Sequence, residues 1–503
     1  MIRAYPGQPS VRPGDTLTLH AATDSARRRC ARFRVTFYRW GDGPEQVHRS
    51  GWLPGAYAGE RGADQDWEWP DYAFPIPSGW PPGVYIADFE EQGGKQTFDL
   101  ARGHGAALFV LRADGSGNAA TRRANGWRAG RLLYKLPLAT YHAYNRSGGG
   151  CFYDRPPRSI DPPGARVSLR RPGGGIGGPV WGAPDYYDAG SPRQSFAHWD
   201  ARFIAWLARS GYAADFCTDL DIHADPGLLR GYDLLVSAGH DEYWSEATRN
   251  ACEDFVGAGG NLAFFGANLC WWRIHPVANG AAMVCHQGGP QGAQDHWWPR
   301  TGAARSEDSL SGASYRHGGG WWDGPRQTRG YLVQQPDHWV FAGTGLTRGA
   351  VLGRDTWPPL AGYECDGAPL DAWNGGSGDS ARGSDGCHPS ASHDNGGSNS
   401  NSGNDDRAGA GLLRLAAWAG EAGTPPGYEV LAAAPLGPDW QELPPRERNG
   451  AGEGLHAATL GLFQRTGTVF SAGTTDWAQV LGCARDRRVE RITRNVLDRL
   501  LHI

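Results

Sequence analysis

The sequence predicts an α/β fold, in which a mostly parallel sheet is flanked by helices and is preceded by an immunoglobulin-like β-sandwich. The chain has 503 residues, which is more than one hydrophobic core usually serves, so we expect at least two domains. Residues 1–118 alternate apolar and polar side chains between turn signals, which is typical of antiparallel strands. Residues 125–503 alternate segments of strand and helix character, which is typical of a parallel sheet covered on both faces.

The first domain is predicted from three segments of strand character. They are TLTLHAAT (16–23), RFRVTFYRW (32–40) and GVYIADFE (83–90), and the turn signals RPGD, GDGP and WPPG bound them. Reactive side chains do not cluster in this region. We therefore expect the sandwich to be structural or to face the substrate.

The second domain is predicted from alternating strands and helices. The expected strands are KLPLATYHAY (135–144), YAADFCTDLD (212–221), YDLLVSAG (232–239) and NLAFFGAN (261–268), and the expected helices are 196–211 and 245–260. A final amphipathic helix is expected at VERITRNVLDRLL (489–501), after an ordered segment at 467–481. Ligands of such sheets bind beyond the carboxyl ends of the strands.

A segment rich in Gly, Ser, Asn and Asp interrupts this domain at residues 371–411. It carries few apolar side chains and therefore cannot bury enough surface to order itself. We interpret it as a surface insertion that follows Glu364 closely enough to shape the entrance of a pocket.

The charge balance and the cysteines limit the classes of partner and location. The 49 basic and 53 acidic residues give a net charge of -4 without long runs of one sign, which argues against nucleic acid and anionic membranes as partners. The nine cysteines include no CxxC pair, so reduced thiols in a cytoplasm are expected. No apolar stretch of about 18 residues occurs, so we expect no membrane span. A small-molecule partner fits these features best.

The sequence SAGHDEYWS (237–245) places three ionisable side chains where a buried strand ends. Charged groups at such a position must be partly desolvated, which requires a compensating partner or a metal ion. Because side chains alternate along a strand, His240 and Glu242 should face one side and Asp241 the other. The alternative is that this segment only caps the following helix, with Asp241 or Ser245 as the N-cap.

Two further clusters contain tyrosines. They are TYHAYNRSGGG (140–150), with Tyr141 and Tyr144 beside a glycine run, and APDYYDAGSPRQSFAHWD (183–200), with Tyr186, Tyr187 and His198. Tyrosine is usually a core or rim residue, so composition alone favours a structural role. The residues by themselves do not join these clusters to His240 and Glu242.

Four strings carry a resemblance to a known family. In order, CTDLDIH, LLVSAGHDEYWS, GGNLAFFGANLCWWR and VFSAGTTDWA resemble the catalytic region of the large (beta) subunit of N,N-dimethylformamidase and its relatives. The resemblance extends from about residue 125 to the C-terminus, and the sandwich resembles the domain that precedes it in these proteins. It implies a fold similar to the glutamine amidotransferases, hydrolysis of a small amide, and a mononuclear Fe(III) held by two tyrosinates and a carboxylate.

The resemblance assigns residues to this site. Glu242 matches the carboxylate ligand and His240 the nearby essential histidine, while Tyr144, with Tyr141 as its rival, matches one tyrosinate. The second tyrosinate in relatives lies ahead of the helix that contains FAHWD, which implies Tyr187 or its neighbour Tyr186. Glu364 in GYECDG resembles a further catalytic carboxylate, and Asn268 in GAN a polar residue of the pocket. A separate small subunit is implied as well, with a homo-oligomer as the other expectation.

This donor set is chemically coherent. Phenolates and a carboxylate are hard oxygen ligands, which suit ferric iron better than zinc. A Lewis acid polarises an amide carbonyl and lowers the pKa of a bound water. His240 is expected to orient that water, Glu364 to act as general base, and Asn268 to donate to the developing oxyanion.

Two other functions are consistent with the residues. A cysteine-dependent amidase would use Cys270, which lies close to a strand end. A non-catalytic module that binds carbohydrate or another ligand would use the Trp-rich loops and the sandwich, since the chain has 22 tryptophans.

Overall fold

The computed structural model describes the chain in fourteen stretches. They are residues 2–23, 32–94, 98–101, 105–113, 131–154, 166–287, 295–298, 302–326, 328, 330–373, 412–437, 440, 455–482 and 486–503. Of the insertion expected at 371–411, residues 374–411 lie outside these stretches. The interpretation of that insertion therefore stays a prediction.

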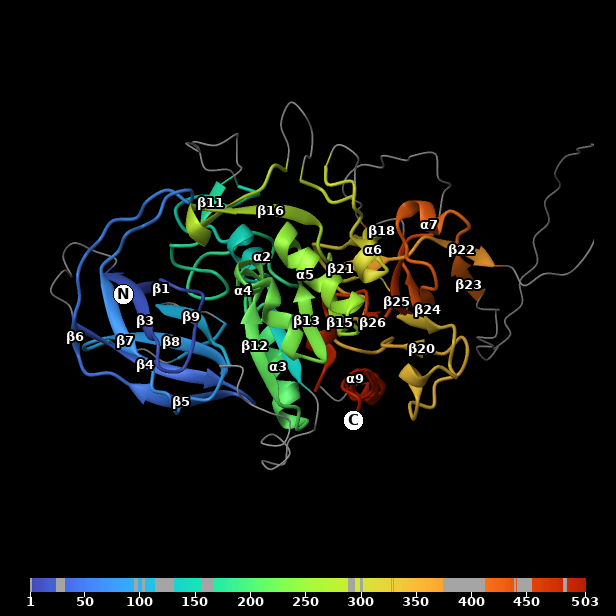
Figure 1. Ribbon diagram of the computed structural model, residues 1–503, viewed down its shortest axis with the longest axis horizontal. Helices are drawn as coiled ribbons and strands as arrows, with labels where there is room; N and C mark the ends of the chain where they lie inside the picture. The colour runs from blue at the N-terminus through green and yellow to red at the C-terminus, as the bar shows by residue number, and fades with distance from the viewer. Residues whose placement is uncertain are drawn as a thin grey trace, which may run out of the picture.

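The N-terminal region forms two sheets that share one core, drawn in blue in Figure 1. The first sheet contains β1 (Ile2–Pro6), β3 (Thr16–Thr23) and β7 (Asp71–Pro75). The second contains β2 (Ser10–Val11), β9 (Ala106–Leu111), β8 (Gly83–Glu91), β4 (Arg32–Trp40) and β5 (Pro44–Arg49), with β6 (Leu53–Pro54) beside β4. Alternate residues of these strands, such as Leu17 and Leu19 in β3, are buried in the shared core. The alternation read from the sequence thus marks the inward positions.

A nine-stranded mixed sheet lies at the centre of the rest of the chain (Figure 1). Its order is β12 (Ala214–Thr218), β10 (Leu132–Leu136), β13 (Leu234–His240), β15 (Asn261–Ala267), β26 (Thr468–Ser471), β25 (Ala457–Gln464), β24 (Glu429–Pro435), β19 (Tyr331–Val333) and β20 (Val351–Leu352). The pairs from β12 to β26 are parallel. The pairs from β26 to β20 are antiparallel.

The predicted fold class, a mostly parallel sheet flanked by helices, is therefore wrong. Half of the pairings in the large sheet are antiparallel, and the described residues form several further sheets with antiparallel pairs and few long helices. The physical reason is the connection of the later strands. β24, β25 and β26 follow one another along the chain and pair as direct antiparallel neighbours, an arrangement that needs no helical crossover.

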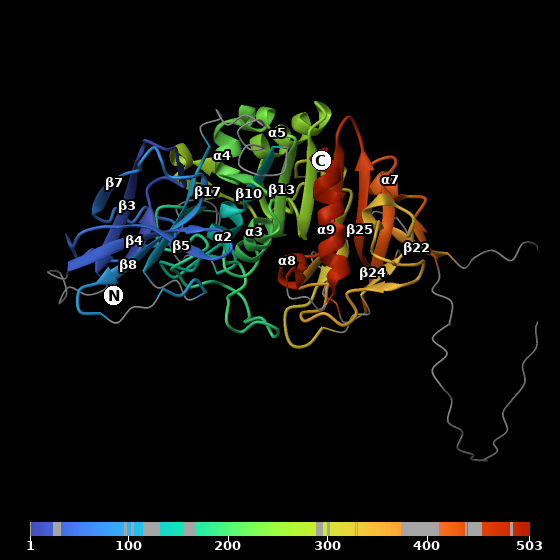
Figure 2. The same ribbon diagram turned by 90° about the horizontal axis from the view of Figure 1, so that it is seen from below.

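Helices cover both faces of the parallel half (Figure 2). The helices α3 (Asp200–Arg209), α8 (Trp477–Val480) and α9 (Arg487–Leu500) share a core with one set of alternating strand residues, which includes Val236. The helix α5 (Glu246–Gly257) shares a second core with the opposite set, which includes Leu235. The short helix α4 (Asp219–Ala224) follows β12 directly. Hydrophobic cores therefore lie on both sides of β13 and the other strands of the parallel half.

The segment 135–144 does not form the single strand expected from its pattern. β10 ends at Leu136, Pro137 precedes the helix, and α2 (Leu138–Tyr144) begins at once. Proline cannot donate to a sheet but tolerates the start of a helix, so the chain changes structure there. Tyr144 is consequently the last residue of a buried helix rather than a strand residue.

Smaller elements complete the described part of the chain. β11 (Arg166–Ser168), β17 (Ala282–Val284), β16 (Trp272–Val277) and β14 (Tyr243–Ser245) form a four-stranded sheet, β18 (Ser314–Gly320) pairs with β21 (Glu364–Gly367), and β22 (Leu370–Trp373) pairs with β23 (Leu412–Leu415). The remaining elements are the helices α6 (Asp308–Ser311) and α7 (Ala419–Ala422) and the 3-10 turns η2 (Pro226–Gly231), η3 (Ala278–Gly280) and η4 (Trp339–Phe341). In the part of the chain that the structure describes, no helix has the length and apolar character needed to cross a membrane.

Candidate functional site

Buried polar side chains meet where two neighbouring parallel strands end. His240 is the last residue of β13, Glu242 follows two residues later, and Asn268 comes directly after β15. Because β13 and β15 pair in register, with His240 opposite Ala267, these three residues reach the same edge of the sheet. Glu364, the first residue of β21, completes the group from a separate sheet.

Two phenols and one carboxylate form the first half of the site. The hydroxyl of Tyr144 donates to Glu242 Oε2 at 2.8 Å, and the hydroxyl of Tyr153 donates to Glu242 Oε1 at 2.8 Å. The two phenol oxygens lie 2.9 Å apart. Tyr144 and Glu242 are both buried. Two phenols from one segment and a carboxylate from a distant part of the chain therefore converge on one point.

Tyr243 and Gln287 support this group from behind. The hydroxyl of Tyr243 lies 2.7 Å from that of Tyr153, and the side-chain amide of Gln287 lies 2.6 Å from the hydroxyl of Tyr243. With its amide oxygen toward Tyr243, Gln287 also accepts from Trp272 and donates to the carbonyl of Phe152. The orientation of Tyr153 is thus held by a chain of polar contacts.

His240, Glu364 and Asn268 form the second half. His240 Nε2 lies 2.8 Å from Glu364 Oε2 and 3.6 Å from Glu242 Oε2, and its Nδ1 lies 2.6 Å from Gln194 Oε1. Asn268 Nδ2 donates to Glu364 Oε2 at 3.0 Å. The imidazole therefore links the oxygen cluster to Glu364.

Asn268 adopts a left-handed backbone with φ of 51°, which asparagine tolerates better than most residues. Its backbone N–H donates to Asp366 Oδ1 at 2.8 Å, which holds the turn in place. The side-chain Oδ1 is buried without a hydrogen-bond partner among the described residues. This oxygen could accept a hydrogen bond from a ligand, whereas the amide nitrogen already contacts Glu364 and His240.

The ionisation of these groups follows from burial and from their mutual distances. Burial raises the pKa of Glu242 to about 7, although His240 opposes this shift. Burial would lower the pKa of His240, but the adjacent carboxylate of Glu364 raises it, and the imidazole in turn lowers the pKa of Glu364 against the effect of burial. Since Glu364 is closer to the imidazole than Glu242 is, we assign the ion pair to His240 and Glu364.

The phenols resist ionisation in the protein alone. Burial, followed by the carboxylate of Glu242, raises the pKa of both Tyr144 and Tyr153 well above the usual value. Both would therefore be neutral at physiological pH unless a cation favoured their ionised forms.

The structure brings most of the site residues predicted from the sequence together, but not all of them. Tyr144, Glu242, His240, Asn268 and Glu364 meet as described above. Tyr187 lies elsewhere: its hydroxyl accepts from the backbone N–H of Arg326 at 2.6 Å, and its ring packs against Trp357.

The alternatives to these residues also lie outside the cluster. Tyr186 is 53% exposed beside Trp357, and the hydroxyl of Tyr141 donates to Asp200. Asp241 faces away from the site and forms an ion pair with Lys135. Ser245 is the N-cap of α5.

Tyr153 is the residue that sequence reasoning missed. It lies nine residues after Tyr144 and faces it across a turn in which Gly148 and Gly149 adopt positive φ values of 85° and 79°. A glycine run beside a tyrosine could have indicated that the chain reverses and returns a nearby side chain. The resemblance to the family instead implies a tyrosine ahead of the helix α3, at Tyr187 or Tyr186.

Cys270 does not have the environment of a nucleophile. It is buried, and burial raises the pKa of its thiol. Reactive cysteines are accessible and have a lowered pKa. The geometry therefore disfavours a cysteine-dependent reaction.

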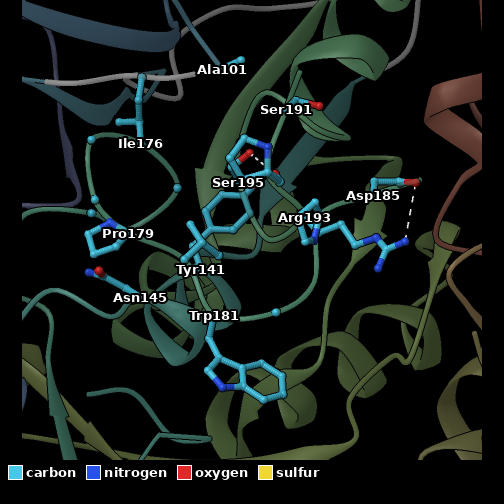
Figure 3. A pocket seen from close by; sticks show the side chains of 18 of the residues that line it. Ala101, Tyr141, Asn145, Ile176, Pro179, Trp181, Asp185, Ser191, Arg193 and Ser195 are labelled. Atoms are coloured by element: carbon cyan, nitrogen blue, oxygen red, sulfur yellow. Dashed lines mark hydrogen bonds and ion pairs between the residues drawn. The ribbon is translucent and has the colours of Figure 1, made fainter. Parts of the chain in front are cut away.

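A cavity of about 380 Å³ lies near the cluster, although none of the cluster residues is among those that line it (Figure 3). The segment 173–178, rich in glycine, forms part of its wall, together with Trp181 and Arg193. Trp181 stacks on Tyr153 with ring centroids 4.7 Å apart, and Arg193 lies over the ring of Tyr363 at 4.2 Å. Arg193 NH2 lies 3.5 Å from Asp185, and the second carboxylate of the wall, Asp188, forms an ion pair with Arg202.

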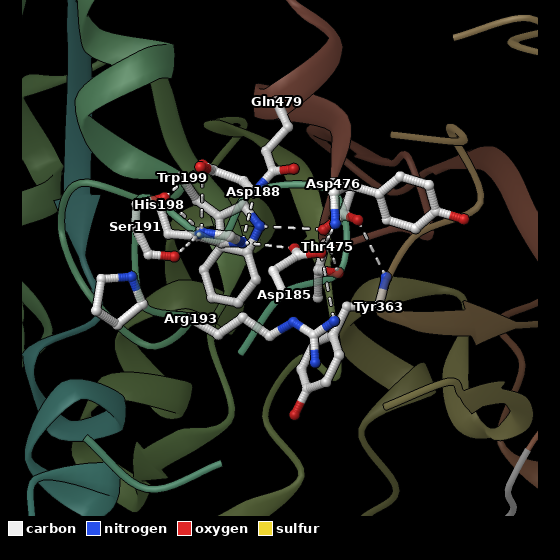
Figure 4. Close-up of polar contacts among 12 residues, drawn as sticks. Asp185, Asp188, Ser191, Arg193, His198, Trp199, Tyr363, Thr475, Asp476 and Gln479 are labelled. Atoms are coloured by element: carbon white, nitrogen blue, oxygen red, sulfur yellow. Dashed lines mark hydrogen bonds and ion pairs between the residues drawn. The ribbon is translucent and has the colours of Figure 1, made fainter. Parts of the chain in front are cut away.

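A buried network holds this wall in place (Figure 4). His198 lies 3.1 Å from Asp185 and 2.8 Å from the hydroxyl of Ser191, while Trp199 donates to Asp476 at 3.1 Å. These contacts fix the segment that presents Gln194 to His240. We interpret the network as support for the site rather than as a second centre.

The chain resembles known proteins in sequence. A family model described as "N,N-dimethylformamidase beta subunit-like, C-terminal" matches residues 31–490. The N,N-dimethylformamidase beta subunit of Alcaligenes sp. is 35% identical over 81 residues, which cover 15% of this chain and 10% of the relative. That of Paracoccus aminophilus is 32% identical over 80 residues, with the same coverage. The chain therefore aligns with only about a tenth of the length of these curated relatives.

Proposed function

The chain belongs to the N,N-dimethylformamidase beta subunit-like family, and from this premise we propose that it hydrolyses the C–N bond of a small, neutral amide with the help of a mononuclear ferric ion. Tyr144, Tyr153 and Glu242 would hold the ion. The observation that carries this proposal is the convergence of two buried side chains, Tyr144 and Glu242, and one partly buried side chain, Tyr153, whose oxygen atoms each lie within 2.9 Å of another.

The residues present fit such an ion. Phenolates and carboxylates are hard oxygen donors, and three protein ligands leave positions open for water and substrate. The raised pKa values of the two phenols also fit, because a cation would supply the charge that their ionised forms lack. Tyr153 would take the place that the resemblance to the family implied for Tyr187 or Tyr186.

A bound ferric ion would supply Lewis acidity to the amide carbonyl. The chain supplies the proton transfers. The pair formed by His240 and Glu364 accepts a proton from the attacking water and returns it to the departing amine nitrogen. Asn268, whose amide is hydrogen-bonded to Glu364, donates to the oxygen on which negative charge develops.

The size and charge of the cavity beside Trp181 fit the small and neutral substrate that we propose. Its volume of about 380 Å³ lies at the lower end of typical small-molecule pockets. Because Arg193 is paired with Asp185, the wall of the cavity offers no unpaired positive charge to the carboxylate of a substrate. We propose that the substrate enters here, beside Trp181.

The curated relatives are named beta subunits. We propose that this chain likewise assembles with a second, different subunit. Co-purification of the natively expressed protein followed by mass spectrometry would test this. A chain that is active and runs alone at its own mass of 54.2 kDa would contradict it.

Metal analysis paired with visible absorption and an assay of N,N-dimethylformamide hydrolysis tests the main proposal. The protein should contain stoichiometric iron, show a phenolate charge-transfer band and release an amine. Tyr153→Phe and Glu242→Gln should lose the band and the activity.

Tyr187→Phe is the matched control, since Tyr187 hydrogen-bonds Arg326 instead and should keep both signals. Iron-free protein with undiminished activity would overturn the proposal. Loss of the band in Tyr187→Phe but not in Tyr153→Phe would overturn the ligand assignment.

A further inference from the structure

A second group of metal-binding side chains lies outside the oxygen cluster. His275 lies on β16, His286 follows β17, and Asp295 comes from the segment 295–298. Their ligand atoms all lie within 4.8 Å of one another. We propose that these three residues form a separate site for a divalent cation of the zinc type, which stabilises the fold and does not take part in the chemistry.

The distances suit such a cation. His275 Nε2 lies 2.9 Å from Asp295 Oδ1, and His286 Nδ1 lies 2.8 Å from Asp295 Oδ2. A tetrahedral zinc ion with ligand bonds of about 2.0–2.1 Å separates its ligand atoms by roughly 3.3 Å. Small movements of the side chains would therefore admit the ion. Two imidazoles and one carboxylate are a nitrogen and oxygen set that zinc accepts, with water in the remaining position.

The carboxylate is held in a fixed position by its surroundings. The side chain of Asp295 is 2% exposed, and the backbone N–H of His286 donates to its Oδ2 at 2.7 Å. Arg273 donates to Oδ1 at 3.2 Å and through its backbone to the carbonyl of Asp295. Hydrogen bonds of this kind orient metal ligands in proteins. The positive charge of Arg273 also limits the affinity, so we expect weaker binding than in a site with several thiolates.

The two histidines are accessible to an ion from solvent. The side chain of His275 is 43% exposed and that of His286 is 30% exposed. An ion can therefore enter and leave without unfolding of the surrounding sheet. The site should accordingly be emptied by chelators.

The proposed site is connected to the oxygen cluster through the chain itself. Gln287 follows His286 directly, and its amide contacts Tyr243, which in turn contacts Tyr153. An ion on His286 would hold the backbone from which Gln287 reaches the cluster. The role that follows is stabilisation of the support behind Tyr153.

The alternative is that Asp295 is only a centre of hydrogen bonds. In that case both ring nitrogens near Asp295 carry protons and donate to the carboxylate. In the metal site the same nitrogens present lone pairs. The two states therefore differ in whether the protein takes up a cation.

Calorimetric titration with Zn²⁺ distinguishes them. The protein is first stripped with a chelator and carries Glu242→Gln, which removes the oxygen cluster as a competing site. We expect one equivalent of Zn²⁺ to bind and to raise the melting temperature, as binding to the folded state must. The affinity should fall at least tenfold on adding His275→Ala, His286→Ala or Asp295→Asn, and should be unchanged by His48→Ala, a control at an exposed histidine of β5.

A second measurement covers the case in which a variant folds poorly. Co²⁺ added to the chelated Glu242→Gln protein should give the absorption of a cobalt ion with nitrogen ligands, and Zn²⁺ should displace it. No uptake of either ion, or equal uptake by the protein with both histidines replaced, would overturn the proposal. Because this background lacks Glu242, the outcome does not depend on whether the oxygen cluster binds iron.

Discussion

His240 and Glu364 form a buried ion pair in which Nε2 and Oε2 are 2.8 Å apart. The pair joins a strand end of the central sheet to the first residue of a strand in a separate sheet. Its partners are fixed as well, because Gln194 holds the other ring nitrogen and Asn268 the carboxylate. In the proposed reaction this pair would transfer protons to and from the reacting group.

Replacement of Glu364 by Gln should therefore slow turnover without removing the metal. The amide keeps the shape of the side chain and its contact with Asn268, but it cannot accept a proton. We expect a loss of roughly 10²–10⁴-fold in kcat, the usual contribution of acid and base catalysis. Iron content and the charge-transfer band should stay at the wild-type level. If kcat remained within a few fold of wild type, Glu364 would have no part in proton transfer.

Replacement of Asn268 by Gly isolates the contribution of its amide. Glycine accepts the positive φ of this position, whereas alanine would add strain to the backbone. We expect kcat to fall by roughly 10²–10³-fold, as for the loss of an oxyanion donor in other hydrolases. KM should change far less than kcat. A change confined to KM would instead assign Asn268 to substrate binding.

The side on which the strand-end side chains lie can be predicted from the local sequence pattern. The register between neighbouring strands then fixes which of these side chains lie together. The period of two in β13 places His240 and Glu242 in the site and turns Asp241 toward Lys135. Parallel pairing with β15 then brings Asn268 alongside. Both relations arise within one sheet, from the alternation of side chains along a strand and from the pairing of adjacent strands. The sequence pattern indicates both.

The identity of the second phenol and the fold class could not be predicted in this way. Both depend on contacts between residues that a local sequence pattern does not indicate. Tyr187 is held by Arg326 and Trp357, which are more than a hundred residues away, while Tyr153 faces Tyr144 only because the chain reverses at Gly148 and Gly149. Likewise, strand propensity alone does not tell a hairpin from a crossover. The antiparallel pairing of the later strands therefore could not be predicted from their sequence.

Breaking the buried ion pair of Lys135 and Asp241 should strongly lower the free energy of unfolding. Both side chains are 0% exposed, and Nζ lies 2.5 Å from Oδ2. Lys135→Met leaves Asp241 buried without its counter-charge, and such removals cost about 3–5 kcal/mol. Urea unfolding should show this loss.

Adding Asp241→Asn should recover part of the stability lost in Lys135→Met, because the uncompensated charge is then gone. The oxygen of the new amide can still accept from the hydroxyl of Ser237, which donates to Asp241 Oδ2 at 2.5 Å. A single Lys135→Met variant as stable as wild type would contradict the assignment of this pair to structure.

The carboxyl of Asp200 predicts a pH dependence of stability. It is buried and accepts from the hydroxyl of Tyr134 at 2.8 Å, and burial raises its pKa to about 7, although its two tyrosine partners oppose the shift. An aspartate in the unfolded chain has a pKa of about 3.9. The folded protein therefore keeps a proton that the unfolded chain releases. The stability that this proton carries is complete below pH ~4 and is lost as the pH rises to about 7.

Asp200→Asn should remove this dependence, because the amide is neutral throughout. The melting temperature of the variant should fall less than that of wild type between about pH 5 and pH 8, by an amount that corresponds to a few kcal/mol at most. Asp71→Asn, at an exposed aspartate of β7, is the matched control and should follow the wild-type curve. Other buried carboxyls titrate in the same range, so the comparison rests on the difference between the two curves. Parallel curves for Asp200→Asn and wild type would show that Asp200 is ionised in the folded protein throughout, with its charge stabilised by the two phenols.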